Sequence, residues 1–69
     1  MSRSSLETRA AILDSANRIV LSRGVEHLTL ESAAHEAGIS KGGLLYHFPN
    51  KEMLIAGMIE HYIQRFTQD

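Results

Sequence analysis

The sequence contains no cysteine, a single proline and no excess of either charge. Because cysteine is absent, disulfides and thiolate metal sites are excluded, and a reducing compartment is compatible with the chain. Seven Lys and Arg residues against eight Asp and Glu residues give a formal net charge of -1. This balance argues against a strongly basic nucleic-acid binder and against a polybasic membrane anchor. The apolar runs are only a few residues long, so we expect no transmembrane span and no signal peptide.

The overall composition is typical of one small domain. The chain has 69 residues, of which 43% are hydrophobic and 22% are charged. A single core in so small a domain seldom supplies more than about 3–5 kcal/mol of stability without a disulfide, a metal or a partner. We therefore expect contacts with another chain, or with more of its own chain, to add stability.

Hydrophobic spacing predicts four helices and no strand. Ser4 and Glu7 have the spacing of a capping box, so the first helix begins after Ser4, and Gly24 is its expected stop. Between these two ends the apolar residues recur at intervals of three and four and form one stripe: Ala10, Ile12, Leu13, Ala16, Ile19 and Val20. This stripe is the expected core face of the first helix.

The second helix is short and slim. Thr29 is the expected cap of the segment LESAAHEA, and Gly38 ends it after about two turns. The inward positions of this segment are Leu30, Ala33, Ala34 and Ala37. Three alanines on one face leave room for another helix to cross at close range.

The third and fourth helices follow at once. Ser40 is the expected cap of a third helix that runs to about Phe48, where Pro49 breaks it. Asn50 can then cap a fourth, longer helix that extends to Phe66. Leu54, Met58 and Tyr62 form one of its apolar stripes, and Ile55, Ile59, Ile63 and Phe66 form another. The other three helices are too short to cover both stripes, so we expect the second stripe to be exposed, with self-association or a frayed end after about Tyr62.

Two short helices joined by the tight turn GIS form a helix-turn-helix, whose second helix usually reads the major groove of DNA. Ala34 lies where the two helices must nearly touch, Ile39 follows the turn glycine as part of the core, and Leu44 anchors the second helix. A generic helical hairpin shares some of these features, so spacing alone leaves both interpretations open.

The ordered run LTLESAAHEAGISKGGLLYHFPNKEMLI closely resembles the N-terminal DNA-binding domain of the TetR family of transcriptional repressors. The matching residues are Thr29, Ala34, Ala37, Gly38, Ser40, Lys41, Gly42, Leu44, Phe48, Lys51 and Leu54. The resemblance covers nearly the whole chain. Two residues depart from the family pattern: Ala33 stands where isoleucine is usual, and Leu45 stands where a phosphate-contacting tyrosine is usual.

The resemblance implies an all-α, homeodomain-like domain over residues 1–69, with the helix-turn-helix at about 29–48 and a connecting helix at about 51–66. It implies sequence-specific binding of double-stranded DNA, at the major groove and phosphates of a palindromic operator, by a cytoplasmic prokaryotic repressor that associates with the nucleoid. It also implies a C-terminal domain, absent from this chain, that forms the homodimer and binds a small-molecule effector. No cofactor and no membrane association are expected.

The expected DNA-binding residues surround the third helix. Lys41 and Lys51 stand in first helical turns, where a lysine opposes the helix dipole, and this favours an anionic partner over a merely solvated side chain. Gly42 and Gly43 cost helix propensity, and close approach of DNA is a reason to tolerate that cost. The full set is Thr29, Ser40, Lys41, Gly42, Gly43, Tyr46, His47 and Lys51. Thr29 is equally well explained as a cap, and His47 as a packed core histidine.

An enzyme is not expected. The four histidines lack the spacing of a helical metal pair, and KGG lacks the strand and spacing of a phosphate loop. The remaining alternative is a small helical protein-interaction module that does not bind DNA, which the slightly acidic balance also suits.

Overall fold

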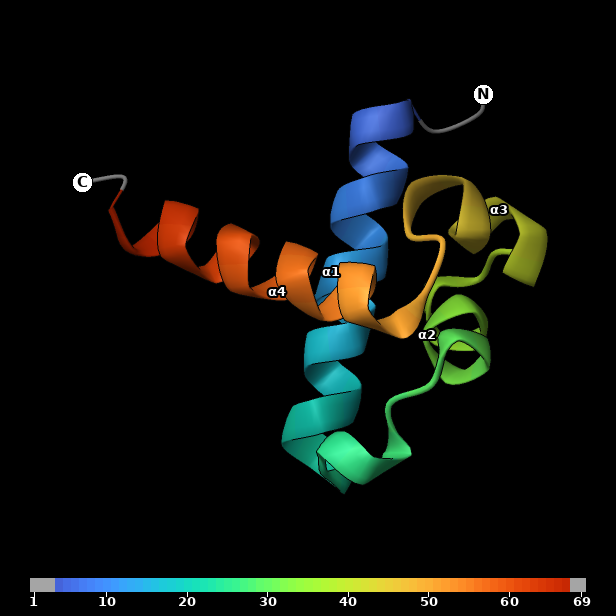
Figure 1. The fold of residues 1–69 in the computed structure, drawn as a ribbon, viewed down its shortest axis with the longest axis horizontal. Helices are drawn as coiled ribbons and strands as arrows, with labels where there is room; N and C mark the ends of the chain where they lie inside the picture. The colour runs from blue at the N-terminus through green and yellow to red at the C-terminus, as the bar shows by residue number, and fades with distance from the viewer. Residues whose placement is uncertain (1–3, 68–69) are drawn as a thin grey trace.

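The computed structural model describes residues 4–67, and this part of the chain is helical without strands (Figure 1). Its elements are α1 (Ser5–Arg23), the 3-10 turn η1 (Val25–His27), α2 (Leu30–Ala37), α3 (Lys41–His47) and α4 (Lys51–Phe66). The predicted all-α class is therefore confirmed. Each of the four predicted helices is present, and their bounds agree with the expected caps to within a residue or two.

Side-chain caps fix where the helices begin. At α1 the Ser4 hydroxyl accepts a hydrogen bond from the Glu7 N–H at 3.1 Å, and the Glu7 carboxylate accepts one from the Ser4 N–H at 2.8 Å. Ser40 Oγ accepts from the Gly43 N–H at 3.0 Å and so caps α3. Asn50 Oδ1 accepts from the Met53 N–H at 2.8 Å and caps α4. Each cap satisfies an amide that the first helical turn leaves without a backbone partner.

Glycines fix where α1 and α2 end. Gly38 is left-handed, with φ of 73°, and its N–H donates to the carbonyl oxygens of Ala34 and His35. Gly24 also has positive φ, 98°, and leads into η1. The sequence did not predict η1, because three residues are too few to show a helical period.

α1 is the element on which the others pack. Figure 1 shows it running through the centre of the molecule, with α2 and α3 on one side and α4 crossing it. The C-terminal half of α4 extends away from the rest of the chain, on the side opposite α3 (Figure 1). α3 and the C-terminal half of α4 therefore lie on opposite sides of α1.

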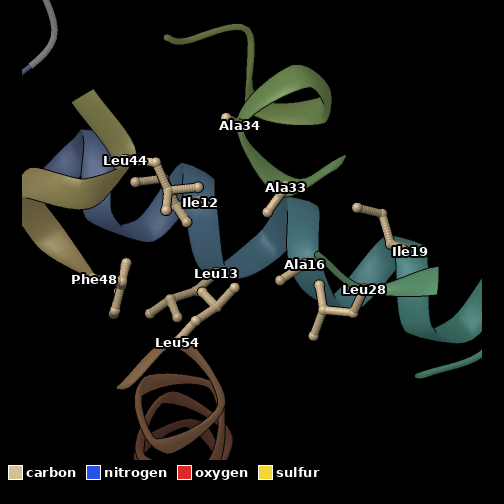
Figure 2. Packing of buried hydrophobic residues seen from close by; sticks show 10 residues of the cluster. All are labelled: Ile12, Leu13, Ala16, Ile19, Leu28, Ala33, Ala34, Leu44, Phe48 and Leu54. Carbon is tan, nitrogen blue, oxygen red and sulfur yellow. The ribbon is translucent and has the colours of Figure 1, made fainter. Parts of the chain in front are cut away.

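One hydrophobic core joins all four helices (Figure 2). Its buried members are Ile12, Leu13, Ala16, Ile19, Leu28, Ala33, Ala34, Leu44, Phe48 and Leu54. Ala33 is 0% exposed and points toward α1 (Figure 2), and Ala34 is 3% exposed, so the small side chains do permit the close helix approach that the sequence predicts. Leu44 is 0% exposed and anchors α3, as expected.

Phe48 connects the end of α3 to α4. Its ring is 2% exposed, and the guanidinium carbon of Arg9 lies 5.3 Å from the ring centroid. On α4, Gly57 faces this ring so closely that a Cβ atom added there would lie 2.7 Å from Phe48 Cε1 and 3.3 Å from Leu13 Cδ2. Gly57 is therefore needed for α4 to pack here, a role that the sequence pattern did not indicate.

The exposed apolar face of α4 is confirmed except at Ile55, which was expected in the exposed stripe but is partly buried against the core near the start of α4. Ile59, Ile63 and Phe66 of the second stripe are 55%, 53% and 72% exposed. Tyr62 was expected in the packed stripe, but it is 64% exposed because it lines an open pocket between α1 and α4, together with Leu13 and Asn17. The expected fraying after Tyr62 is not observed, since α4 continues to Phe66.

Replacing Gly57 by Leu should destabilise the fold, because the new side chain must displace the buried Phe48 ring. Overpacking of this kind typically costs about 1–3 kcal/mol, which outweighs the gain in helix propensity of up to about 1 kcal/mol. The matched control is Ala56→Leu, which places the same side chain at the adjacent, exposed position of α4. Thermal unfolding followed by circular dichroism should show a lower Tm for Gly57→Leu alone. Equal Tm values for the two variants would mean that α4 does not pack on Phe48.

Candidate nucleic-acid interface

The outer face of α3 is formed by residues that lie opposite its anchor. Leu44 points into the core, while Lys41, Gly42 and Tyr46 are exposed. Gly42 and Tyr46 are four residues apart and so lie on the same face of the helix. This face combines the open space at Gly42 with the Tyr46 ring and its hydroxyl, and Lys41 stands beside it, three residues before Leu44.

Nothing within the described residues requires a glycine at position 42. Its φ is not positive, so the backbone would accept any L-residue. A Cβ atom added there would meet only Ser40 Oγ, at 4.0 Å, among residues 4–67. At Gly43 a Cβ would lie 3.3 Å from the same hydroxyl, so crowding by the cap gives a partial internal reason for that glycine. Gly42 is thus the position where the chain leaves open space on the outside of α3.

The two hydroxyl residues of the expected set are helix caps. Thr29 Oγ1 accepts a hydrogen bond from the Ser32 N–H at 2.9 Å, and Ser32 Oγ accepts one from the Thr29 N–H at 2.9 Å. The Ser40 hydroxyl caps α3 through Gly43. Both Thr29 and Ser40 are exposed, so capping and contact with an outside partner can occur together.

Tyr46 and His47 differ in how far they reach. Tyr46 is 80% exposed, and its ring meets the His47 ring edge-on with the centroids 5.1 Å apart. His47 is half-buried and lies 6.4 Å from the Phe48 ring, centroid to centroid. Tyr46 is therefore free to contact a partner, whereas His47 is partly committed to the aromatic cluster at the end of α3.

The two lysines of the expected set are in different electrostatic states. Lys41 Nζ donates a hydrogen bond to Glu31 Oε2 at 2.6 Å, which joins the first turn of α2 to the first turn of α3. This hydrogen bond, helped by the positive charge of Lys41, holds the pKa of the Glu31 carboxyl below its ordinary value. Lys51, the first residue of α4, is half-buried and makes no ion pair within residues 4–67.

The structure therefore places the expected residues in three neighbouring parts of the chain. Six of them lie in or directly before α3: Ser40, Lys41, Gly42, Gly43, Tyr46 and His47. Thr29 precedes α2, whose start is tied to α3 by the Glu31–Lys41 pair, and Lys51 opens α4. Glu31 is the residue that sequence reasoning missed, because its partner is ten positions away across a turn and no helical period connects them.

Within residues 4–67 the structure shows neither a metal cluster nor a membrane-spanning helix. No group of three metal-ligating side chains comes together there. None of its helices has the length and apolar character needed to cross a membrane.

Comparison with known proteins identifies the helix arrangement. The sequence model described as "Bacterial regulatory proteins, tetR family" matches residues 12–58, from the middle of α1 to the middle of α4. The chain belongs to the TetR family. The resemblance that the sequence suggested is thereby confirmed, and with it the helix-turn-helix of a transcriptional regulator.

Three relatives illustrate the match within the TetR family. The chain is 39% identical over 54 residues to the HTH-type transcriptional regulator TtgR of Pseudomonas putida, which covers 78% of this chain and 26% of TtgR. It is 38% identical over 63 residues to the HTH-type transcriptional repressor BepR of Brucella suis, covering 91% of this chain and 29% of BepR. It is 35% identical over 57 residues to the uncharacterised regulator YerO of Bacillus subtilis, covering 83% and 20%.

The matched relatives are much longer than this chain, which spans between 20% and 29% of the length of these three. They are transcriptional regulators by name, and none of the three is named as an enzyme. No solved structure matches the chain at a significant level.

The Glu31–Lys41 pair predicts a measurable titration shift. Replacing Lys41 by Met removes the hydrogen bond and the charge, so the pKa of Glu31 should rise toward its ordinary value. A lowered carboxyl pKa adds stability that is present above the unfolded-state pKa and is lost as the pH falls through the folded-state pKa, and this contribution is small because the pair is exposed. NMR titration of the side-chain carboxyl carbons measures the shift.

Lys51→Met is the control for that titration, because it removes a lysine that does not touch Glu31. It should leave the Glu31 pKa where it is in the parent. An unchanged Glu31 pKa in Lys41→Met would mean that the two side chains are not paired in solution.

Proposed function

We propose that this domain binds double-stranded DNA in a sequence-specific manner, as the DNA-binding part of a TetR-type transcriptional regulator, with α3 in the major groove. The observation that carries the proposal is the outer face of α3, where Gly42 leaves space that no residue of the described chain fills. The major groove is wide enough to admit an α-helix, and a glycine on the inserted face lets the backbone approach the DNA closely.

The packing of α3 supports this role. Leu44 and Phe48 hold the helix on α1 and α4, so its outer face projects as a rigid surface and not as a mobile loop. A rigid reading helix does not lose additional conformational freedom when it enters the groove. α2 lies beside it, as the first helix of a helix-turn-helix does when it crosses the sugar-phosphate backbone.

The proposed contacts fall into two groups. Lys51, Tyr46, Thr29 and Ser40 surround α3 with polar groups that suit phosphate oxygens, and Lys41 joins them once it leaves Glu31. Gly42 and Gly43 supply close approach and not a side-chain contact. His47 contributes at most one edge of its ring, because the aromatic cluster holds the remainder.

The finer regulatory role is also a proposal. BepR is named as a repressor, and repression is the activity we propose for the protein to which this domain belongs. The matched relatives are three to five times longer than the aligned part, which suits a further domain for dimerisation and for a small-molecule effector. A homodimer would place two α3 helices on the two halves of a palindromic operator. Binding to the chromosome would then place the protein in the cytoplasm of a bacterium, at the nucleoid.

One observation favours the alternative function, a protein-interaction module. The exposed apolar residues of α4 form a face that a second helix would cover well: Ile59, Tyr62, Ile63 and Phe66. This face and the α3 face lie on opposite sides of α1, so both functions can be present in the same chain. DNA titration separates them, because an interaction module alone gives no DNA complex.

Lys51→Gln tests the proposed interface through the salt dependence of DNA binding. Each lost phosphate contact should lower the slope of log K against log salt concentration by about 0.9. Fluorescence anisotropy with a labelled duplex of random sequence, measured at several salt concentrations, gives this slope. Arg65→Gln is the control, because it removes the same charge from the far end of α4.

The parent should bind the duplex at low salt, with a shallower slope for Lys51→Gln and an unchanged slope for Arg65→Gln. Absence of any DNA complex with the parent would contradict the proposed function. A slope that changes with Arg65 and not with Lys51 would place the DNA-binding surface at the C-terminal end of α4 and not around α3.

A further inference from the structure

Glu31 forms an ion pair with Lys41, the first residue of α3. We propose that Glu31 competes with DNA phosphate for Lys41 and thereby lowers the affinity of this domain for DNA. This inference rests on the proposed function, and it adds a residue that sets how strongly the DNA-binding face attracts the DNA backbone.

The geometry of the pair is specific. Glu31 is the second residue of α2 and Lys41 is the first residue of α3, so the bond between them spans the turn of the helix-turn-helix. At 2.6 Å the Nζ–Oε2 distance is that of a charge-assisted hydrogen bond and not of a loose surface contact. The carboxylate also lies in the positive first turn of α2, which favours its charged form in this position.

The other ion pairs of residues 4–67 do not touch the proposed interface. Glu36 pairs with Arg18 and Arg23 between α2 and α1. Glu60 pairs with Arg9, and Asp14 lies near two side chains of α4, between α1 and α4. Glu31 is therefore the one carboxylate in the described chain that pairs with an expected DNA contact.

The Glu31–Lys41 pair changes the local charge strongly, because residues 40–51 carry few charges. Lys41 and Lys51 are the only formally charged residues between positions 40 and 51. With Lys41 neutralised by Glu31, Lys51 is the one lysine of this segment whose charge is uncompensated by an ion pair within residues 4–67. In a chain of net charge -1, removing one of two local cations weakens the electrostatic attraction on which sequence-independent binding depends.

The pair is also easy to open. Both side chains are largely exposed, at 51% for Lys41 and 66% for Glu31, and exposed ion pairs contribute little to stability. The pair therefore contributes little to folding. On DNA binding, Lys41 Nζ would exchange the Glu31 carboxylate for a phosphate oxygen, and Glu31 would be left unpaired near the negatively charged backbone. Both consequences oppose binding.

The test is a double-mutant cycle on DNA affinity. Glu31→Gln, Lys41→Gln and the double variant of the 69-residue chain are titrated with a labelled duplex of random sequence over a range of salt concentrations. In the parent background Glu31→Gln should raise the affinity several-fold at every salt concentration, because Lys41 no longer has to leave a carboxylate in order to reach phosphate. In the Lys41→Gln background the same replacement should have a much smaller effect.

Glu26→Gln in η1 is the matched control, since it makes the same change in net charge away from the interface. Glu26→Gln should raise the DNA affinity only by the small amount expected from the loss of one negative charge. The inference is overturned if Glu31→Gln raises affinity no more than Glu26→Gln does. It is also overturned if its effect is equal with and without Lys41, because Glu31 would then act by repelling DNA directly.

The failure of the proposed function would look different. In that case neither the parent nor any variant forms a complex with the duplex at low salt, and all their titration curves are the same. Circular dichroism of each variant shows that it is folded, which is expected because both side chains are exposed.

Discussion

The position of α3 depends on how closely α2 approaches α1. That approach is set by Ala33, which has no side chain beyond Cβ, is fully buried and points toward α1 (Figure 2). A larger side chain at this position would push α2 outward and carry the turn at Gly38 with it. Since α3 follows that turn after two residues, its orientation would change as well. In a domain with only one small core, such a displacement would also remove a large part of the free energy of unfolding.

The second constraint is the junction at Phe48. The ring is held between α1 and α4, with Arg9 above it and Gly57 facing it, so the end of α3 and the start of α4 cannot move independently. Leu44 fixes the other part of α3. The helix is thus held from beneath at two points one turn apart, and its outer face is available for binding without rearrangement.

Local chemistry made much of this fold predictable from the sequence. The capping box of Ser4 and Glu7, the Ser40 and Asn50 caps and the left-handed Gly38 all act within four residues, so their spacing is visible in the sequence. The order of these signals also carried the family resemblance. Contacts between residues that are distant in sequence could not be predicted, such as Gly57 with Phe48 and Glu31 with Lys41. Tyr62 was misplaced for a related reason, because the open pocket that it lines between α1 and α4 depends on how these two helices cross.

The central claim is that the open surface at Gly42 is where DNA approaches α3. The most direct test is the DNA affinity of Gly42→Leu, with Asn17→Leu as the control that adds the same side chain to an exposed position of α1. The structure has room for the leucine at position 42, so both variants should keep the helical circular dichroism spectrum and the Tm of a folded domain. We predict that Gly42→Leu lowers DNA affinity by about tenfold or more, equivalent to about 1.4 kcal/mol, while Asn17→Leu leaves it unchanged. A folded Gly42→Leu variant that binds DNA as well as the parent would contradict the account.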